Sequence, residues 1–372
     1  MTTIPAERTQ ETAEKLTRLR TWMDEERLSV VILRRTASVA WITAGATDYV
    51  NTATSEGPIT AVITADRAVA ITNNIEAPRF RDEEYLDRTG WEIVEVPWYD
   101  AAAAPSPAAV TGIEMNPETA GSDVPYPGTR NVGGEITRLR SRLLPVEQAR
   151  FRDLAAECAA VMNEAAARTE PGQSEFEIAG HLAAASRPRG IQEIVNLVAT
   201  DDRIHRYRHP LPTEKKLERH ALLVLCGRRD GLVASISRIV HFGPVPEEIR
   251  HVHEAVARID AAVISASRPG RTLGEIFSDI RIAYEAAGFP GGWKGHHQGG
   301  VAAYEPREFL ALPGSTDRLE AGMVCAWNPS LPGAKSEDSI IIGPDGPEVV
   351  TGIDGWPMVE TATLPRPGIL TR

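Results

Sequence analysis

The sequence predicts an α+β protein of two domains, an α/β domain in residues 1–145 and a larger domain in residues 146–372. Three observations predict this class. A chain of 372 residues exceeds what one hydrophobic core usually serves. Short β-rich runs alternate with helical stretches before Pro145, whereas long amphipathic helices dominate after it. The second part also repeats itself at an offset of 98 residues, because Glu170-Pro171-Gly172 is followed by Arg268-Pro269-Gly270.

The first domain is predicted from alternating elements. Leu16, Leu19, Trp22 and Met23 share one face of a helix in residues 11–27, and the apolar run that follows reads as a buried strand. Strands are predicted at 28–33, 59–64, 68–72 and 92–97, and further helices at 76–85 and 131–143. The Ala- and Pro-rich segment 101–110 is predicted to be a loop or the frayed start of a helix.

The second domain is predicted to consist of two similar halves. Long helices with an apolar stripe are expected at 145–169 and 246–267. After each comes a capping box, a Ser or Thr with Glu three residues later, at Ser174 and at Thr272. Strands then follow at 194–198 and 221–241 in the first half, and at 323–327 and 339–342 in the second. Two such halves facing one another would form a pseudo-twofold sheet with helices outside and a site between them.

Composition excludes several classes of function. The net charge of −11 argues against nucleic acid or an anionic membrane as a partner. No apolar run approaches the roughly 18 to 20 residues that cross a bilayer. The polar N-terminus lacks the apolar core of a signal peptide, so a cytoplasmic location is expected. Cys158, Cys226 and Cys325 are widely spaced in apolar surroundings and are expected to be buried free thiols.

Two stretches have the composition of ligand sites. His296 and His297 lie in the glycine-rich run 291–300, which lets backbone approach a ligand at a cost to regular structure. The alternative is a surface turn with two solvated histidines. In the first domain, Arg34 and Arg35 follow a predicted strand, where α/β folds often present ligand contacts. An exposed loop is the alternative there.

These features resemble the pita-bread clan of creatinase, Xaa-Pro aminopeptidase and methionine aminopeptidase. The resemblance rests on the two-domain order, the duplicated helix pairs and the glycine-flanked His297 followed by Glu305. It covers most of the chain. It implies a creatinase-like N-terminal domain in 1–145, a pita-bread catalytic domain with a pseudo-twofold repeat in 146–372, and a homodimer.

The resemblance also implies that most metal ligands are missing. Metallopeptidases of this clan hold two divalent cations with two Asp, one His and two Glu, because hard cations need anionic oxygen ligands. The matching positions in this sequence are Leu225, Ser235, His297, Asn328 and Glu337. Only His297 and Glu337 keep the family's residue type. We therefore expect neither a metal nor another cofactor.

Creatinase works without metal and uses a histidine for proton transfer, and His209 is the residue that matches this histidine. His205 is a second candidate in the same basic stretch, residues 203–210. Nearby cations should lower a histidine pKa and favour the neutral, basic form at pH 7. A solvated basic loop before Pro210 is the alternative.

The resemblance implies roles for the remaining residues. Tyr304 would donate a hydrogen bond to a developing oxyanion, and Glu337 with Glu305 would hold a cationic group of the substrate. Arg238 would orient Glu337 or touch substrate, and Arg34 and Arg35, from a partner subunit, would bind a carboxylate. The expected catalytic residues are therefore His209, His297, Tyr304 and Glu337, and the expected substrate-binding residues are His205, His296, Arg34, Arg35, Arg238, Glu305 and Asn328.

Three functions are compatible with these residues. The leading one is metal-independent hydrolysis, or a related lyase or cyclisation step, at a C–N bond of a small amino-acid-like zwitterion. The second is a metal-dependent Xaa-Pro aminopeptidase with relocated ligands, which metal retained after dialysis would identify. The third is a catalytically inactive binding protein.

Overall fold

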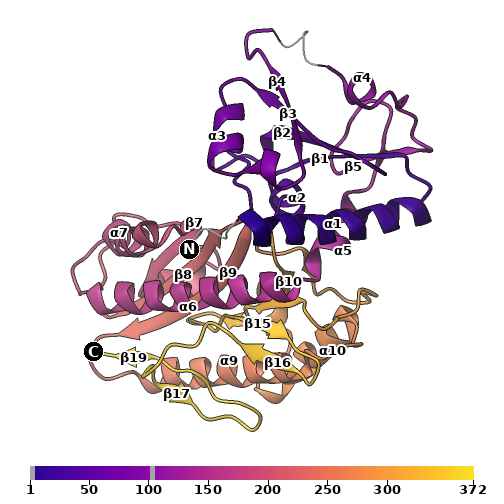
Figure 1. Ribbon diagram of the computed structural model, residues 1–372. Helices are drawn as coiled ribbons and strands as arrows, with labels where there is room; N and C mark the ends of the chain where they lie inside the picture. Colours follow the sequence, from indigo (N-terminus) through magenta and orange to yellow (C-terminus); the bar gives the residue numbers. More distant parts are fainter. Residues whose placement is uncertain (1–4, 101–104) are drawn as a thin grey trace. The chain divides into compact units, whose positions relative to one another are not determined.

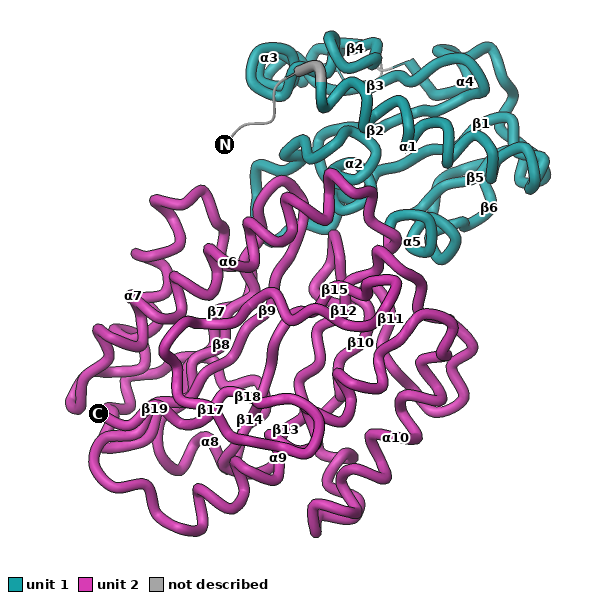
Figure 2. The backbone as a smooth tube through the Cα atoms, turned by 60° about the horizontal axis from the view of Figure 1, so that its bottom comes forward, with its two compact units in different colours: residues 1–140 teal, residues 141–372 magenta. Residues whose placement is uncertain are grey.

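The computed structural model describes residues 5–100 and 105–372, and the chain forms two compact units, residues 1–140 and 141–372 (Figure 2). The first four residues of the predicted 101–110 loop lie outside the described part, and helix α4 covers most of the remainder. Among the described residues, none of the helices combines the length and apolar character that crossing a bilayer requires.

Unit 1 has the α/β architecture that its alternating pattern predicts. The described residues of this unit form six strands, β1 (Val30–Arg35), β2 (Glu56–Thr64), β3 (Ala68–Asn73), β4 (Glu92–Val96), β5 (Ala120–Ser122) and β6 (Arg130–Asn131). They form one mixed sheet in the order β4-β3-β2-β1-β5-β6. The helices are α1 (Pro5–Glu25), α2 (Thr36–Ile42), α3 (Ala77–Asp82), α4 (Pro107–Thr111) and α5 (Gly133–Ser141). The apolar run of β1 is buried as predicted, because it is a central strand that packs Val30 against Val62 and Val69.

The first half of unit 2 packs two helices on a four-stranded sheet. Figure 1 shows the long helix α6 lying along this sheet. The elements are α6 (Pro145–Arg168), α7 (Glu175–Ser186), β7 (Gln192–Thr200), the short helix α8 (Asp202–Arg206), β8 (His220–Arg229) and β9 (Leu232–His241). The C-terminal strand β19 (Leu370–Thr371) pairs in parallel with β9, so the strand order is β19-β9-β8-β7.

The second half repeats this plan with a five-stranded sheet of order β11-β10-β12-β15-β16. Its main elements are α9 (Glu247–Ala266), α10 (Leu273–Ala286), β10 (Gly299–Ala302), β11 (Phe309–Leu310), β12 (Val324–Trp327), β15 (Asp338–Ile342) and β16 (Pro347–Val349). Two small ladders complete unit 2, formed by β13 (Ser330–Leu331) with β14 (Ala334–Lys335) and by β17 (Met358–Val359) with β18 (Arg366–Pro367).

Equivalent hydrogen bonds confirm the predicted pseudo-twofold repeat. Gly172 and Gly270 both adopt left-handed backbone, with φ of 87° and 86°. Their N–H groups donate to Leu217 and Leu319 respectively, each at 2.8 Å. Both predicted capping boxes form, at the starts of α7 and α10. The two sheets meet where the N–H of Ser237 in β9 donates to the carbonyl of Glu337 at 3.1 Å.

Candidate functional site

A cavity of about 330 Å³ lies in unit 2, lined by residues of both halves. Its apolar walls are Val195, Leu197, Val224 and Pro306. Its polar lining residues are His209, Cys226, His297, Arg307, Asn328, Lys335 and Glu337. Four of the residues predicted from the sequence, His209, His297, Asn328 and Glu337, therefore come together here from segments far apart in the chain.

Three histidines meet at this cavity. Nε2 of His296 lies 3.1 Å from Nε2 of His209, and Nδ1 of His296 lies 3.0 Å from the Ser330 hydroxyl. The rings of His296 and His297 are 4.5 Å apart between centroids. The glycines after these histidines have a structural reason: a Cβ on Gly299 would lie 2.1 Å from the carbonyl oxygen of Ala326 in β12. The close strand pairing that follows His297 thus requires glycine.

Burial and neighbouring cations keep the three imidazoles neutral at pH 7. Burial, followed by the charge of Lys335, lowers the pKa of His209 and brings that of His296 to about 2. Burial, followed by the charge of Arg307, lowers the pKa of His297 to about 4. The pKa of His209 is thus lowered, as the sequence predicts. The cation that contributes most to this shift, Lys335, comes from a distant part of the sequence.

Glu337 is buried and already bonded to three side chains. Lys335 Nζ lies 2.7 Å from its Oε2, Arg307 donates to Oε1 at 2.9 Å, and the Ser237 hydroxyl donates to Oε2 at 2.5 Å. Burial alone would raise the pKa of this carboxyl, but these two cations and the hydrogen bonds lower it below its usual value. Glu337 is therefore ionised, and its negative charge is already balanced by Lys335 and Arg307. It is not an unpaired anion that a cationic substrate group could bind.

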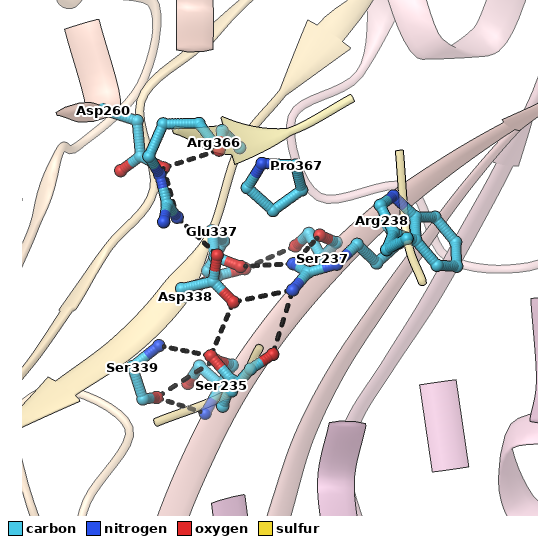
Figure 3. A network of polar contacts seen from close by, with 12 residues as sticks. Ser235, Ser237, Arg238, Asp260, Glu337, Asp338, Ser339, Arg366 and Pro367 are labelled. Carbon is cyan, nitrogen blue, oxygen red and sulfur yellow. Dashed lines mark hydrogen bonds and ion pairs between the residues drawn. The ribbon is translucent and has the colours of Figure 1, made fainter. Parts of the chain in front are cut away.

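A second buried charge network lies behind Glu337 (Figure 3). Asp338 accepts hydrogen bonds from Arg238 at 2.8 Å and from the Thr351 hydroxyl at 2.6 Å, and it pairs with Arg366. Arg366 Nε also donates to Asp260 at 2.8 Å. Because successive residues of a strand face opposite sides, Asp338 points away from Glu337. Arg366 comes from the C-terminal tail, so the tail contributes a cation to this buried network.

Strand register corrects one assignment made from the sequence. The resemblance matches Leu225 to the family's first aspartate, but Val224 and Cys226 line the cavity and Leu225 lies between them on the other face of β8. Cys226 pairs with Ser235 across the hairpin, and its Sγ lies 3.2 Å from the Ser235 hydroxyl. A carboxylate is present at none of these positions. Cys158, Cys226 and Cys325 are buried and free, as predicted.

The side chains present do not fit a two-metal centre. Such a centre needs several carboxylates around a bridging oxygen. Glu337 is the one carboxylate among the described residues that line the cavity, and Lys335 and Arg307 already bond to it. The three imidazoles are spaced for one ion, with ligand atoms within 4.8 Å of one another. Positive charges on Lys335 and Arg307 at the same cavity oppose even a single dication.

Several predicted site residues lie elsewhere. The Tyr304 hydroxyl donates to Glu147 at 2.5 Å and is outside the cavity lining, so it is not placed to stabilise an oxyanion there. Arg238 does not line the cavity either; it donates to Asp338 and, at 3.2 Å, to the carbonyl of Glu337, so its contact with that residue is to backbone. Glu305 is also outside the lining, and its N–H donates to Glu308 at 3.2 Å.

The other basic candidates are likewise not part of the cavity wall. His205 lies beside Gly333. Arg34 and Arg35 belong to unit 1, where their N–H groups donate to Asp123 at 2.9 and 3.2 Å. The Arg34 side chain pairs with Glu56 at 3.1 Å.

Sequence reasoning missed Lys335 and Arg307, the two cations at this cavity. A signal was present for Lys335, because residues two apart in an extended segment share a face, and Lys335 precedes Glu337 by two. Arg307 gave no comparable signal. It follows the turn after β10, and its contact with Glu337 depends on the fold.

Two family models match the chain. The model described as metallopeptidase family M24 matches residues 149–346, and the creatinase/prolidase N-terminal domain matches residues 15–121. An uncharacterized peptidase of Staphylococcus epidermidis is 25% identical over 193 residues, which cover 48% of this chain and 54% of that protein. The chain thus spans about half the length of this curated relative.

Two further relatives are informative. The agropine synthesis cyclase of Rhizobium rhizogenes is 29% identical over 143 residues, which cover 36% of each protein. The structure of an Xaa-Pro dipeptidase from Bacillus anthracis superposes with a TM-score of 0.77 at 20% identity, covering 97% of this chain and 100% of that one. The structural likeness shows a shared fold in both parts of the chain.

Proposed function

Because the chain belongs to metallopeptidase family M24, we propose that it is a metal-independent hydrolase of the creatinase type, with His209 as general acid and base at a C–N bond of a small amino-acid-like molecule. One observation carries the proposal. Three neutral imidazoles meet at a cavity whose carboxylate is neutralised by Lys335 and Arg307. Such a site can move protons near pH 7, whereas its donor set does not suit a pair of dications.

The hydrogen-bond pattern supports a role for His209 in proton transfer. Its Nε2 faces Nε2 of His296, whose Nδ1 is held by Ser330. Nδ1 of His209 has no partner among the described residues and is the nitrogen available to water or substrate. In the proposed reaction His209 takes a proton from water as the oxygen attacks the carbon of the C–N bond. The same proton then passes to the leaving nitrogen as the bond breaks.

A cyclisation is the second candidate, and the similarity to the agropine synthesis cyclase favours it. His209 would then take the proton of a substrate hydroxyl, and that oxygen, in place of water, would attack the carbon of the C–N bond in the same molecule. The C–N bond breaks as the ring closes, and the proton passes from His209 to the leaving nitrogen. Turnover in H₂¹⁸O separates the two reactions. Hydrolysis introduces one ¹⁸O atom into a product, whereas cyclisation introduces none.

We expect the purified protein, after dialysis, to contain far less than one equivalent of manganese, cobalt or zinc per chain. The reason is the positive charge of Lys335 and Arg307 and the loss of carboxylate ligands. Elemental analysis by mass spectrometry checks this. EDTA is expected to leave turnover unchanged. Two stoichiometric metal ions and chelator-sensitive cleavage of Xaa-Pro dipeptides would instead identify a metal-dependent aminopeptidase.

The lowered pKa of His209 predicts the pH dependence of kcat/KM. A general base acts in its neutral form, so activity is present above its pKa and is lost as pH falls through it. Burial and Lys335 place that pKa below the ordinary 6.5, so the acid limb is expected below pH 6.5. Lys335→Met should move the limb upward, and Lys216→Met, an exposed lysine outside the cavity, should not. A wild-type limb above pH 6.5 contradicts the assignment.

The substrate is to be sought among N-acyl amino acids, N-amidino amino acids and Xaa-Pro dipeptides, with products followed by mass spectrometry. If purified, folded protein turns over none of them and binds them without change, the third function, a binding protein, is favoured. The expected homodimer and cytoplasmic location stay predictions.

A further inference from the structure

Building on the proposed function, we propose that this cavity is a binding site for a carboxylate and that Lys335 is the residue that selects it. The substrate would accordingly carry a net negative charge, with an uncharged nitrogen in the C–N bond. This differs from the zwitterion expected from the sequence, in which Glu337 held a cationic group.

The charges at the cavity are the first support. Among the described residues that line it, the charged ones are Lys335, Arg307 and Glu337, two positive and one negative, which leaves a net charge of +1. The three histidines are neutral at pH 7. A cavity of this sign attracts an anion, and the low-dielectric walls strengthen the attraction.

The position of Lys335 is the second support. Its side chain is only 5% exposed, although an ammonium group is costly to bury. An ammonium has three hydrogens to donate, and Glu337 is its one polar partner in the described part of the chain. A carboxylate oxygen in the cavity would supply a further acceptor and a second counter-charge.

Saturation of Glu337 is the third support. Lys335, Arg307 and Ser237 already bond to its two oxygens, so a cationic substrate group would have to displace one of them. A neutral nitrogen has a better partner in Asn328. Asn328 is 2% exposed and lines the cavity, and its Oδ1 is buried with no hydrogen-bond partner among the described residues. An N–H group of an amide would satisfy this oxygen.

Size completes the chemical description. The cavity volume of about 330 Å³ lies at the lower end for small-molecule sites. Val195, Leu197 and Val224 form an apolar wall suited to a short hydrocarbon part. The ligand class is therefore a small N-acyl amino acid, bound as a monoanion.

The test uses acetate and the neutral acetamide as probes, because both are small enough for the cavity and neither needs turnover. Each is titrated into the full-length protein at pH 7 and constant ionic strength. NMR follows the imidazole Cε1–H signals of His209, His296 and His297. Acetate is expected to shift these signals saturably and at lower concentration than acetamide, which offers Asn328 an N–H group but carries no negative charge. Equal responses to both probes would overturn the proposal.

Three variants assign the effect to Lys335. Lys335→Met should weaken acetate binding about tenfold or more, since it removes a charged hydrogen bond. The matched Lys216→Met, which removes an equal charge at an exposed site, should leave binding unchanged. Glu337→Gln raises the net charge of the lining to +2 and should tighten binding. If Lys335→Met does not fold, Glu337→Gln decides: weaker or unaltered acetate binding in that variant overturns the proposal.

A failure of the carboxylate-site proposal can be distinguished from a failure of the proposed reaction. Loss of turnover in His209 variants leaves acetate binding intact if both proposals hold. A folded protein that turns over substrate but does not distinguish acetate from acetamide disproves the carboxylate site alone.

Discussion

His209→Asn is expected to lower kcat by about 10²- to 10⁴-fold, the range that general acid–base catalysis contributes. Asparagine can still form a hydrogen bond toward His296, but it cannot accept a proton near pH 7. His209 as a whole is exposed, although part of its ring is buried at the cavity wall, so the free energy of unfolding should change by no more than about 0.5 kcal/mol. Steady-state kinetics on the substrate found among the candidate compounds measures the change in kcat. Urea unfolding measures the change in the free energy of unfolding.

Two histidine variants serve as comparisons for His209→Asn. His205→Asn changes the other candidate of the same segment, which lies outside the cavity lining, and is expected to retain turnover. His251→Asn changes an exposed histidine on α9 and controls for the substitution itself. Full turnover in His209→Asn would remove the proposed mechanism, and loss confined to His205→Asn would transfer the role to His205.

Asp338→Ala is expected to lower the free energy of unfolding by about 3 to 5 kcal/mol, the usual cost of removing one partner from a buried ion pair. Asp338 lies between Arg238 and Arg366, whose side chains are 1% and 2% exposed (Figure 3). Without it, Arg238 keeps hydrogen bonds only to backbone carbonyls, and Arg366 keeps Asp260. Urea unfolding measures the loss.

The matched control is Asp345→Ala, which removes an exposed aspartate just after the same strand and should change stability by less than about 0.5 kcal/mol. A loss below about 1 kcal/mol for Asp338→Ala would mean that solvent or rearranged side chains compensate the two arginines. Because Arg238 also contacts the carbonyl of Glu337, we expect the acetate response of the cavity to weaken in this variant as well.

Local signals in the sequence accounted for most of the fold. Ser174 with Glu177 and Thr272 with Glu275 predicted the starts of α7 and α10, because a capping box is completed within four residues. The 98-residue offset predicted two equivalent halves, because the same turn and helix cap occur in each half. These are also local features of the sequence. The register of β8 was not predicted, and Leu225 lies on the face of that strand opposite the cavity. A shift of one residue changes the face of every side chain in a strand.

Sequence patterns were sufficient to predict the two-part architecture, and the family resemblance pointed to missing metal carboxylates and to His209, His297 and Glu337. The neighbours of these three residues became known from the fold. It brought Lys335 and Arg307 onto Glu337, joined His209 to His296, and left Tyr304 and Arg238 bonded elsewhere. Helix caps and strand periods are encoded by neighbours in the chain. The charge of a cavity depends on residues that become neighbours only after folding.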